Sequence, residues 1–379
     1  MEKIKLDDLC VPSARQIKED PDKLIDYIDI ASVDNENKKV TGFQTMSFGE
    51  APSRARKAVK KGSILVSTVR PNLNAVAILE DDTPNVSVAS TGFCILNCKD
   101  NVDNRFVFNF CKSKAFIEDM VSQATGASYP AVSDNIVRSA LVPNYPYEEQ
   151  CHISEILDRV SSAIEKRKVE LAILDELIKA RFVEMFANWK KKYLAEPLGE
   201  YLQDITYGFT NPMPDAEEGP WKITAKDVVN GIVNLDTARK TLQESYDKLT
   251  EKSKPQLGDV LLTKDGTLGR TAVVEIEGMC VNQSVAVLRI NEKILPKYLS
   301  ILLQMPKYQR DMIADAGGGT IKHIYITKVV KMPIVVPSIE EQNTFLDFVN
   351  QVDKSKVAVQ KALEQTQTLF DSLMQKYFG

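Results

Sequence analysis

Two long segments with apolar residues at heptad spacing constrain this chain more than any other feature. One covers 148–192 and the other 338–379, and the tripeptide Glu-Glu-Gln stands near the start of each, ending at Gln150 and at Gln342. Apolar positions that step by four and three residues without an intervening Pro indicate a long helix with a continuous pairing stripe. The chain is therefore expected to contain two long helices, one after each half of the sequence.

The stripes of the two helices correspond position by position. In the first they comprise Ile153, Leu157, Val160, Ile164, Arg167, Leu171, Leu174, Ile178, Arg181 and Met185. In the second they comprise Phe345, Val349, Val352, Lys356, Val359, Leu363, Thr366, Phe370, Leu373 and Tyr377. Polar interruptions fall at different places in the two series, which favours pairing between the two helices over pairing of either with its own copy. The alternative is that each helix packs separately on its own domain.

The segments that precede the helices, 1–147 and 193–337, are expected to be two globular domains with a related fold. Gly62-Ser-Ile-Leu-Val-Ser in the first matches Gly258-Asp-Val-Leu-Leu-Thr in the second. Runs typical of strands lie at 63–69, 75–79, 260–263, 271–276 and 285–290, with a shorter helix near 103–122 and 295–313. The predicted fold is mixed α/β (α+β): two domains with curled sheets alternate with two long helices in a pseudo-twofold repeat.

Charge and cysteine content narrow the classes of function. Lys and Arg number 48 against 52 Asp and Glu, for a net charge of −4, so any nucleic-acid surface must be a local patch. No apolar run approaches a membrane helix and the first residues lack the core of a signal peptide, so a cytoplasmic protein is expected. The six cysteines show no metal-ligand spacing and only two histidines are present, which indicates reduced structural thiols and no zinc site.

Catalytic motifs are not found in the sequence. It contains neither G-x-x-x-x-G-K-[ST] nor G-x-G-x-x-G, so nucleotide binding has no support. Asn211-Pro-Met-Pro214 lacks the third-position Pro and the aromatic residue of the tetrad in adenine methyltransferases. Pro21-Asp22 with Glu36 and Lys38 fits a nuclease pattern so permissive that chance explains it.

Basic and polar turns at the domain edges are the remaining candidates for a binding site. Arg and Asn side chains can pair with guanine and adenine edges through two hydrogen bonds. The candidate DNA-binding residues are Arg54, Arg56, Lys57, Arg70, Asn72 and Asn74 in the first domain and Lys264, Arg270, Lys322, His323 and Tyr325 in the second. Solvated hairpins are the alternative interpretation, and it is weakened because the turns recur at equivalent places in both halves.

This arrangement resembles the specificity subunit of type I restriction-modification systems over essentially the whole chain. The resemblance is carried by Ala51–Lys57 leading to Gly62–Asn72, by Gly258–Ala272, and by the Pro and Glu-Glu-Gln that introduce each helix. It implies that each domain is a target-recognition domain for one half of a bipartite, asymmetric DNA site. It also implies that the antiparallel helices set the spacer and dock two methyltransferase (modification) subunits. Twelve residues are expected to carry pairing and docking: Leu157, Val160, Ile164, Leu171, Leu174, Ile178, Val349, Val352, Val359, Leu363, Phe370 and Leu373.

The resemblance further implies a chain without catalysis of its own. S-adenosylmethionine, ATP and Mg would belong to the methyltransferase subunits and to separate restriction or motor subunits. Three alternatives stay open at this point. The chain could serve a related system that only methylates or that cuts on both sides of its site, it could be a stand-alone DNA methyltransferase or nuclease, or it could be a coiled-coil scaffold that binds no DNA.

Overall fold

The computed structural model describes residues 2–12, 16–186, 194–229, 231–314 and 322–379. The chain divides into two compact units, of which the first comprises Met1–Glu170 with Val359–Gly379 and the second Leu171–Ala358. Each unit therefore combines one α/β domain with one part of each long helix. Within the described part of the chain, no helix has both the length and the hydropathy of a membrane span.

The first unit contains two larger sheets and a short strand pair. The pair joins β1 (Lys3–Lys5) to β11 (Leu141–Pro143). The five-stranded sheet has the order β10 (Phe93–Leu96), β7 (Ile64–Ser67), β8 (Val76–Ile78), β4 (Lys39–Val40), β3 (Val33–Asp34). The four-stranded sheet has the order β5 (Gln44–Ser47), β2 (Leu24–Ile28), β9 (Val86–Ser90), β6 (Ala55–Ala58). The described residues of this unit also form four short α-helices: α1 (Leu6–Leu9), α2 (Asn104–Lys112), α3 (Lys114–Gln123) and α4 (Asp134–Ser139).

The second unit repeats this plan. A strand pair joins β12 (Glu196–Pro197) to β22 (Pro333–Ile334), and a four-stranded sheet has the order β13 (Leu202–Tyr207), β21 (Val285–Ile290), β18 (Val260–Thr263), β19 (Thr271–Val273). Two smaller sheets contain β17 (Arg239–Lys240), β14 (Ala216–Ile223) and β20 (Met279–Val281), and β15 (Val228–Val229) with β16 (Ile232–Val233). Its short helices are α7 (Gln243–Asp247), α8 (Pro296–Gln304), α9 (Pro306–Ala314) and α10 (Ile326–Lys331).

The strands expected from the sequence are present, and several are shorter than expected. A single helix was expected near 103–122 and another near 295–313, and this prediction is wrong in one respect. Each segment forms two helices joined at an extended residue. Ser113 has φ −68° and ψ 150°, and its hydroxyl accepts the Phe116 N–H and so caps α3. Met305 is likewise extended, and Pro306 begins α9, where its missing N–H costs nothing.

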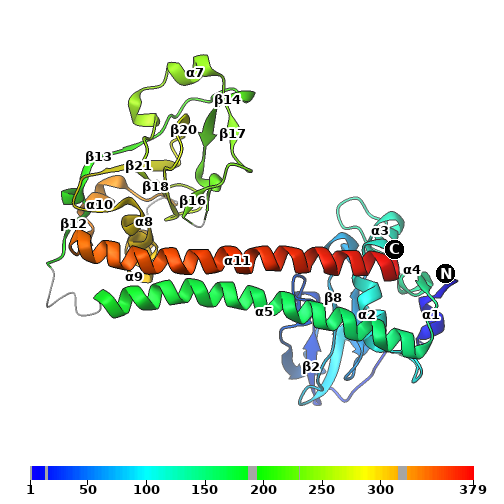
Figure 1. Ribbon diagram of the computed structural model, residues 1–379. Coiled ribbons are helices and arrows are strands. Elements are labelled where there is room, and N and C mark those ends of the chain that lie inside the picture. Colours follow the sequence, from blue (N-terminus) through cyan, green and yellow to red (C-terminus); the bar gives the residue numbers. More distant parts are fainter. Residues whose placement is uncertain (1, 13–15, 187–193, 230, 315–321) are drawn as a thin grey trace. The chain divides into compact units, whose positions relative to one another are not determined.

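The two long helices are α5 (Tyr147–Phe186) and α11 (Ile339–Phe378). In the first unit, Ile153 near the beginning of α5 shares a core with Phe378 at the end of α11. Further along, the Arg167 guanidinium donates to the Thr366 hydroxyl, so two of the polar interruptions in the stripes meet each other. In Figure 1, α2 lies beside the beginning of α5, where Phe106 joins the same core.

The second unit shows the same helix pairing. Asp175 of α5 pairs with Lys356 of α11 at 2.6 Å, and the rings of Phe186 and Phe345 have centroids 6.0 Å apart. In both units residue numbers rise along α5 as they fall along α11, so the helices are antiparallel. The expected fold of two α/β domains alternating with two paired helices is confirmed. The segment 187–192, included in the first expected helix, lies outside the described residues.

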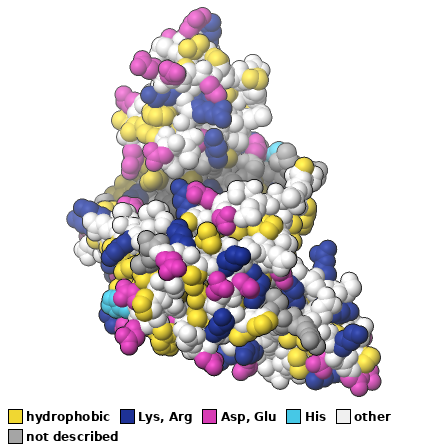
Figure 2. Space-filling view, turned by 90° about the vertical axis from the view of Figure 1, so that its right-hand side faces the viewer, with side chains coloured by type: hydrophobic (Ala, Val, Ile, Leu, Met, Phe, Trp, Pro, Cys, Tyr) yellow, Lys and Arg dark blue, Asp and Glu magenta, His cyan; other side chains and the backbone are white. Residues whose placement is uncertain are grey.

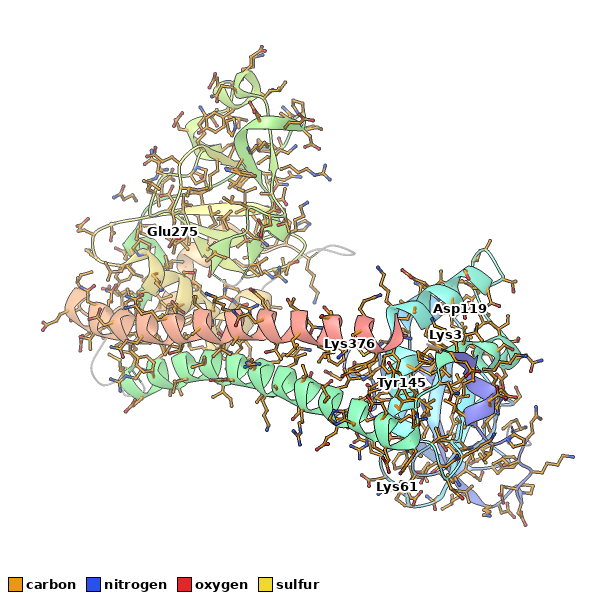
Figure 3. The ribbon with its side chains drawn as sticks, turned by 45° about the vertical axis from the view of Figure 1, so that its right-hand side comes forward. Lys3, Lys61, Asp119, Tyr145, Glu275 and Lys376 are labelled. Atoms are coloured by element: carbon orange, nitrogen blue, oxygen red, sulfur yellow. The ribbon has the colours of Figure 1, made fainter. Side chains whose placement is uncertain are left out.

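A buried Gln explains why Glu-Glu-Gln recurs. Gln150 is 3% exposed, donates to the Tyr145 carbonyl (2.8 Å) and accepts the Asp103 N–H (3.1 Å). Gln342 is fully buried, donates to the carbonyls of Pro337 (2.9 Å) and Lys293 (3.0 Å), and accepts the Leu295 N–H (2.8 Å). Each Gln therefore joins the start of a long helix to the residues before it and to the loop before a short helix. Figure 3 labels Tyr145 at this junction.

The twelve residues expected to pair the helices are all buried or half-buried. Four of the twelve are almost inaccessible: Leu157, Ile164, Val349 and Val352. The others are half-buried: Val160, Leu171, Leu174, Ile178, Val359, Leu363, Phe370 and Leu373. Among the half-buried ones, Phe370 and Leu373 pack on the core of the first unit and Ile178 on the core of the second.

Candidate nucleic-acid interface

Equivalent turns follow an inner strand of the larger sheet in each unit, β7 in the first and β18 in the second. After β7, the Thr68 N–H donates to Gly92 and its carbonyl accepts from Val132, both at 2.8 Å. After β18, the Lys264 N–H donates to Ser284 and its carbonyl accepts from Ile324, both at 2.9 Å. Gly92 and Ser284 immediately precede β10 and β21, and Val132 and Ile324 lie two residues before α4 and α10. These bonds make Thr68 and Lys264 equivalent, and with them the residues that follow.

In the turn of the first unit, the Arg70 side chain lies over an aromatic ring. Arg70 is exposed, its N–H donates to Pro130 (2.7 Å), and its guanidinium lies 4.5 Å from the centroid of the Tyr129 ring. Tyr129 is 62% exposed, and Asn72 is exposed on the same turn. Arg70 and Asn72 were candidates from the sequence, whereas Tyr129 was not, because it lies 59 residues from Arg70 and carries no charge.

Asn74 is buried in the domain and does not reach the surface. Its side chain is 8% exposed and donates to the Cys111 carbonyl at 2.9 Å. Its own carbonyl accepts from the Lys38 ammonium at 2.6 Å. The prediction that Asn74 contacts DNA is therefore wrong, because its side-chain amide is hydrogen-bonded inside the domain.

The basic run before β7 contains an exposed side chain and others that contact groups within the unit. Arg54 is exposed, while Arg56 is half-buried with its guanidinium 5.1 Å from the Phe48 ring. The Lys57 ammonium bonds to Asp134 and to the Phe93 carbonyl, both at 2.6 Å, and its side chain is 17% exposed. The charge of Lys57 is thus already neutralised within the unit.

The turn in the second unit has a different charge pattern. Asp265 bonds to the Lys264 ammonium (2.9 Å) and to His323 Nδ1 (2.6 Å), and Lys264 also lies 5.3 Å from the Tyr207 ring. Lys322 is exposed beside His323. Asp265 and Tyr207 were absent from the candidates, because an acid and an aromatic residue gave no signal of their own.

Two further candidates lie at the margins of this second turn. Tyr325 is 47% exposed, with the Lys328 ammonium 5.8 Å from its ring. Arg270 is half-buried at the end of the turn, where its N–H donates to the Thr263 hydroxyl at 2.9 Å. Lys264, His323 and Asp265 are therefore brought together, and Arg270 belongs to the base of the same hairpin.

The chemistry available at the two turns is that of recognition. They offer guanidinium, ammonium, amide and imidazole groups beside aromatic rings, which suit hydrogen bonding and stacking with nucleic acid. In the described ranges, no group of three or more His, Cys, Asp or Glu residues could hold a metal ion. On the face drawn in Figure 2, Lys and Arg side chains are interspersed with Asp and Glu, so cationic groups there are local.

The fold defines a protein with two related α/β domains, an equivalent polar turn in each, and two paired long helices. A family model described as type I restriction modification DNA specificity domain matches residues 1–173 and 211–366. The chain belongs to this family, and the family that its repeated motifs indicated is confirmed.

Curated relatives carry the corresponding names. The chain is 23% identical over 317 residues to the type I restriction enzyme EcoBI specificity subunit of Escherichia coli, covering 74% of this chain and 66% of that protein. It is 23% identical over 289 residues to the putative type I restriction enzyme specificity subunit S.HindORF215P of Haemophilus influenzae, covering 73% and 72%. The match thus spans just under two thirds of the length of the first relative.

Solved structures share the fold. A chain from a study of complex assembly and conformational transition in the type I R-M system has a TM-score of 0.60 and 22% identity, covering 100% of this chain and 97% of its own. The S subunit of a type I restriction-modification system from M. genitalium has a TM-score of 0.56 and 16% identity, covering 100% and 96%. At these identities the likeness concerns the fold alone.

Proposed function

We propose that this chain is the DNA-reading subunit of a type I restriction-modification complex, with each α/β domain reading one half of a bipartite site. The observation that carries this proposal is one turn built twice with different side chains. Arg70 on Tyr129 occupies the first turn, and Lys264, Asp265 and His323 occupy the second. Base edges are discriminated by donor and acceptor pattern, so unlike turns favour unlike half-sites and an asymmetric sequence.

The long helices are proposed to hold the spacer between the half-sites and to dock two methyltransferase subunits. Outward-facing apolar residues on the helices support docking. In the second unit, Ile173 is 60% exposed, Val183 58% and Val357 70%. In the first unit, Val169 is 56% and Leu369 51% exposed. These residues are the positions on the helices at which a partner would bury apolar surface.

The chain is proposed to be non-catalytic and to act in the cytoplasm. S-adenosylmethionine, ATP and Mg would then be bound by methyltransferase subunits and by restriction or motor subunits. Support comes from the sequence, which lacks nucleotide-binding loops and a complete adenine methyltransferase tetrad. A related complex that only methylates, or that cuts on both sides of its site, would use this chain in the same way.

The proposal is tested by expressing the chain with its methyltransferase partner in a host without adenine methylation. Sequencing of methylated bases is expected to give one motif of two unlike halves separated by unspecified bases. Omitting this chain should abolish methylation, and the purified chain alone should transfer no methyl group. A continuous motif, or methylation that does not depend on this chain, would contradict the proposal.

A further inference from the structure

We propose that Arg70, held on the Tyr129 ring, reads a guanine in the half-site of the first domain through two hydrogen bonds. This inference rests on the proposed function and assigns a specific base contact within it. Because the fold repeats, the turn in the second unit shows which features of the first turn the backbone itself requires.

The fold requires a left-handed backbone at the position of Arg70. Arg70 has φ 50°, and Gly266, two residues after Lys264 as Arg70 is after Thr68, has φ 78°. Glycine adopts this conformation freely, whereas a side chain with a Cβ makes it unfavourable. The second unit therefore has the residue that the backbone favours, and the first unit has Arg despite a cost in stability.

The same turn has a second left-handed residue, Asn74. Its side chain is explained by a hydrogen bond inside the domain, which the Arg70 side chain lacks. Asn74 (φ 46°) and Gly269 (φ 78°) each lie two residues before the return strand, β8 or β19. Asn tolerates this region, and Asn74 gains a buried hydrogen bond to Cys111. Among the described residues, the Arg70 guanidinium has no hydrogen bond or ion pair, and it lies over the Tyr129 ring.

The contact with Tyr129 orients the guanidinium and leaves its donors available. Both side chains are exposed, and the main-chain bond from Arg70 to Pro130 (2.7 Å) fixes the two loops together. A phosphate needs only a nearby cation, and the first unit has other exposed cations, such as Arg54. A planar guanidinium held in one orientation instead suits O6 and N7 of guanine, the acceptor pair that Arg reads most often. These observations favour a base contact over a phosphate contact.

The experiment compares methylation motifs of the complete complex carrying substituted chains. Arg70→Gly introduces the residue found at this position in the second unit, and the variant should melt no lower than the wild type. Arg70→Lys keeps the positive charge but lacks the planar guanidinium that donates two parallel hydrogen bonds. Both are expected to relax one guanine position in one half-site, so that other bases there gain about tenfold or more in relative methylation. Tyr129→Ala should relax the same position. Arg105→Ala removes a guanidinium that pairs with Asp158 at 2.7 Å and should leave the motif unchanged.

The outcomes separate this inference from the function on which it rests. If the wild-type complex gives no bipartite motif, the proposed function fails, and the inference with it. If the wild-type motif is bipartite but both Arg70 variants preserve it, Arg70 does not read a base. A uniform fall in methylation with an unchanged motif would identify a phosphate contact and overturn the inference. A motif whose specified bases include no G·C pair would also overturn it.

Discussion

Asp26 shows how the first unit stabilises a buried charge. Its carboxylate is inaccessible and accepts hydrogen bonds from the Thr45 hydroxyl (2.6 Å) and from the Asn85 main-chain N–H (2.7 Å) and amide (3.1 Å). Burial raises the pKa of Asp26, but these hydrogen bonds together outweigh that effect and leave the pKa below its usual value. The carboxylate joins β2 to β5 and to the residue before β9.

We expect Asp26→Asn to destabilise the protein by about 1–3 kcal/mol at pH 7, because an amide replaces an acceptor of three donors. A lowered folded pKa stabilises the fold above the unfolded value of about 3.9, and this stabilisation is lost as the pH falls through the folded pKa. The difference in unfolding free energy between wild type and variant should therefore be largest at neutral pH and decrease below about pH 4. Urea unfolding across this range measures it.

The matched control is Asp22→Asn, a change of the same chemistry at an exposed residue of the same unit. It should alter stability by less than about 0.5 kcal/mol. Equal effects of the two substitutions, or an Asp26→Asn deficit that stays constant through acid pH, would show that the hydrogen-bonded carboxylate is not the cause.

At the scale of elements, the buried Gln at the start of each long helix is a structural requirement. Replacing Gln342 by Leu would keep its bulk but leave the Leu295 N–H and the carbonyls of Pro337 and Lys293 without their partner. We expect a loss of about 2–4 kcal/mol when these three groups lose their hydrogen bonds. Thermal unfolding measures the effect. Gln351→Leu, at an exposed position of the same helix, is the control and should be nearly neutral.

A finding of equal stability for both Gln variants would mean that Glu-Glu-Gln recurs for a reason other than this junction.

The sequence predicted the helices themselves well, because their heptad stripe extends over many turns. It predicted one helix where α2 and α3 lie, because a cap at Ser113 leaves the apolar periodicity on both sides intact. The break becomes evident only from the extended backbone of that residue.

At the scale of the whole molecule, each unit is completed by an aromatic residue from the end of one long helix. Phe378 of α11 lies 5.2 Å from Phe106 by ring centroids in the first unit. In the second, Phe186 of α5 lies 6.0 Å from Phe345 and from Tyr298. Residues distant in sequence are therefore required for each core.

We expect Phe378→Ala to cost about 3–5 kcal/mol in the first unit, because a large buried ring is removed. Amide hydrogen exchange should rise in α2 and its neighbouring strands and stay unchanged in β18 and β21. Phe345→Ala should give the reverse pattern. Leu369→Ala, at an exposed position of α11, should change neither unit. Equal loss of protection in both units after one substitution would show that the units unfold together.

The two long helices, the two related domains and the family could be predicted from the sequence, because each depends on patterns that repeat along the chain. The sequence also located the turns that carry Arg70 and Lys264. The tertiary structure alone decided which side chains meet there, because Tyr129 and His323 reach those turns from segments about 60 residues away. It likewise distinguished exposed Arg70 from buried Asn74, since exposure depends on packing between segments distant in sequence and not on residue type.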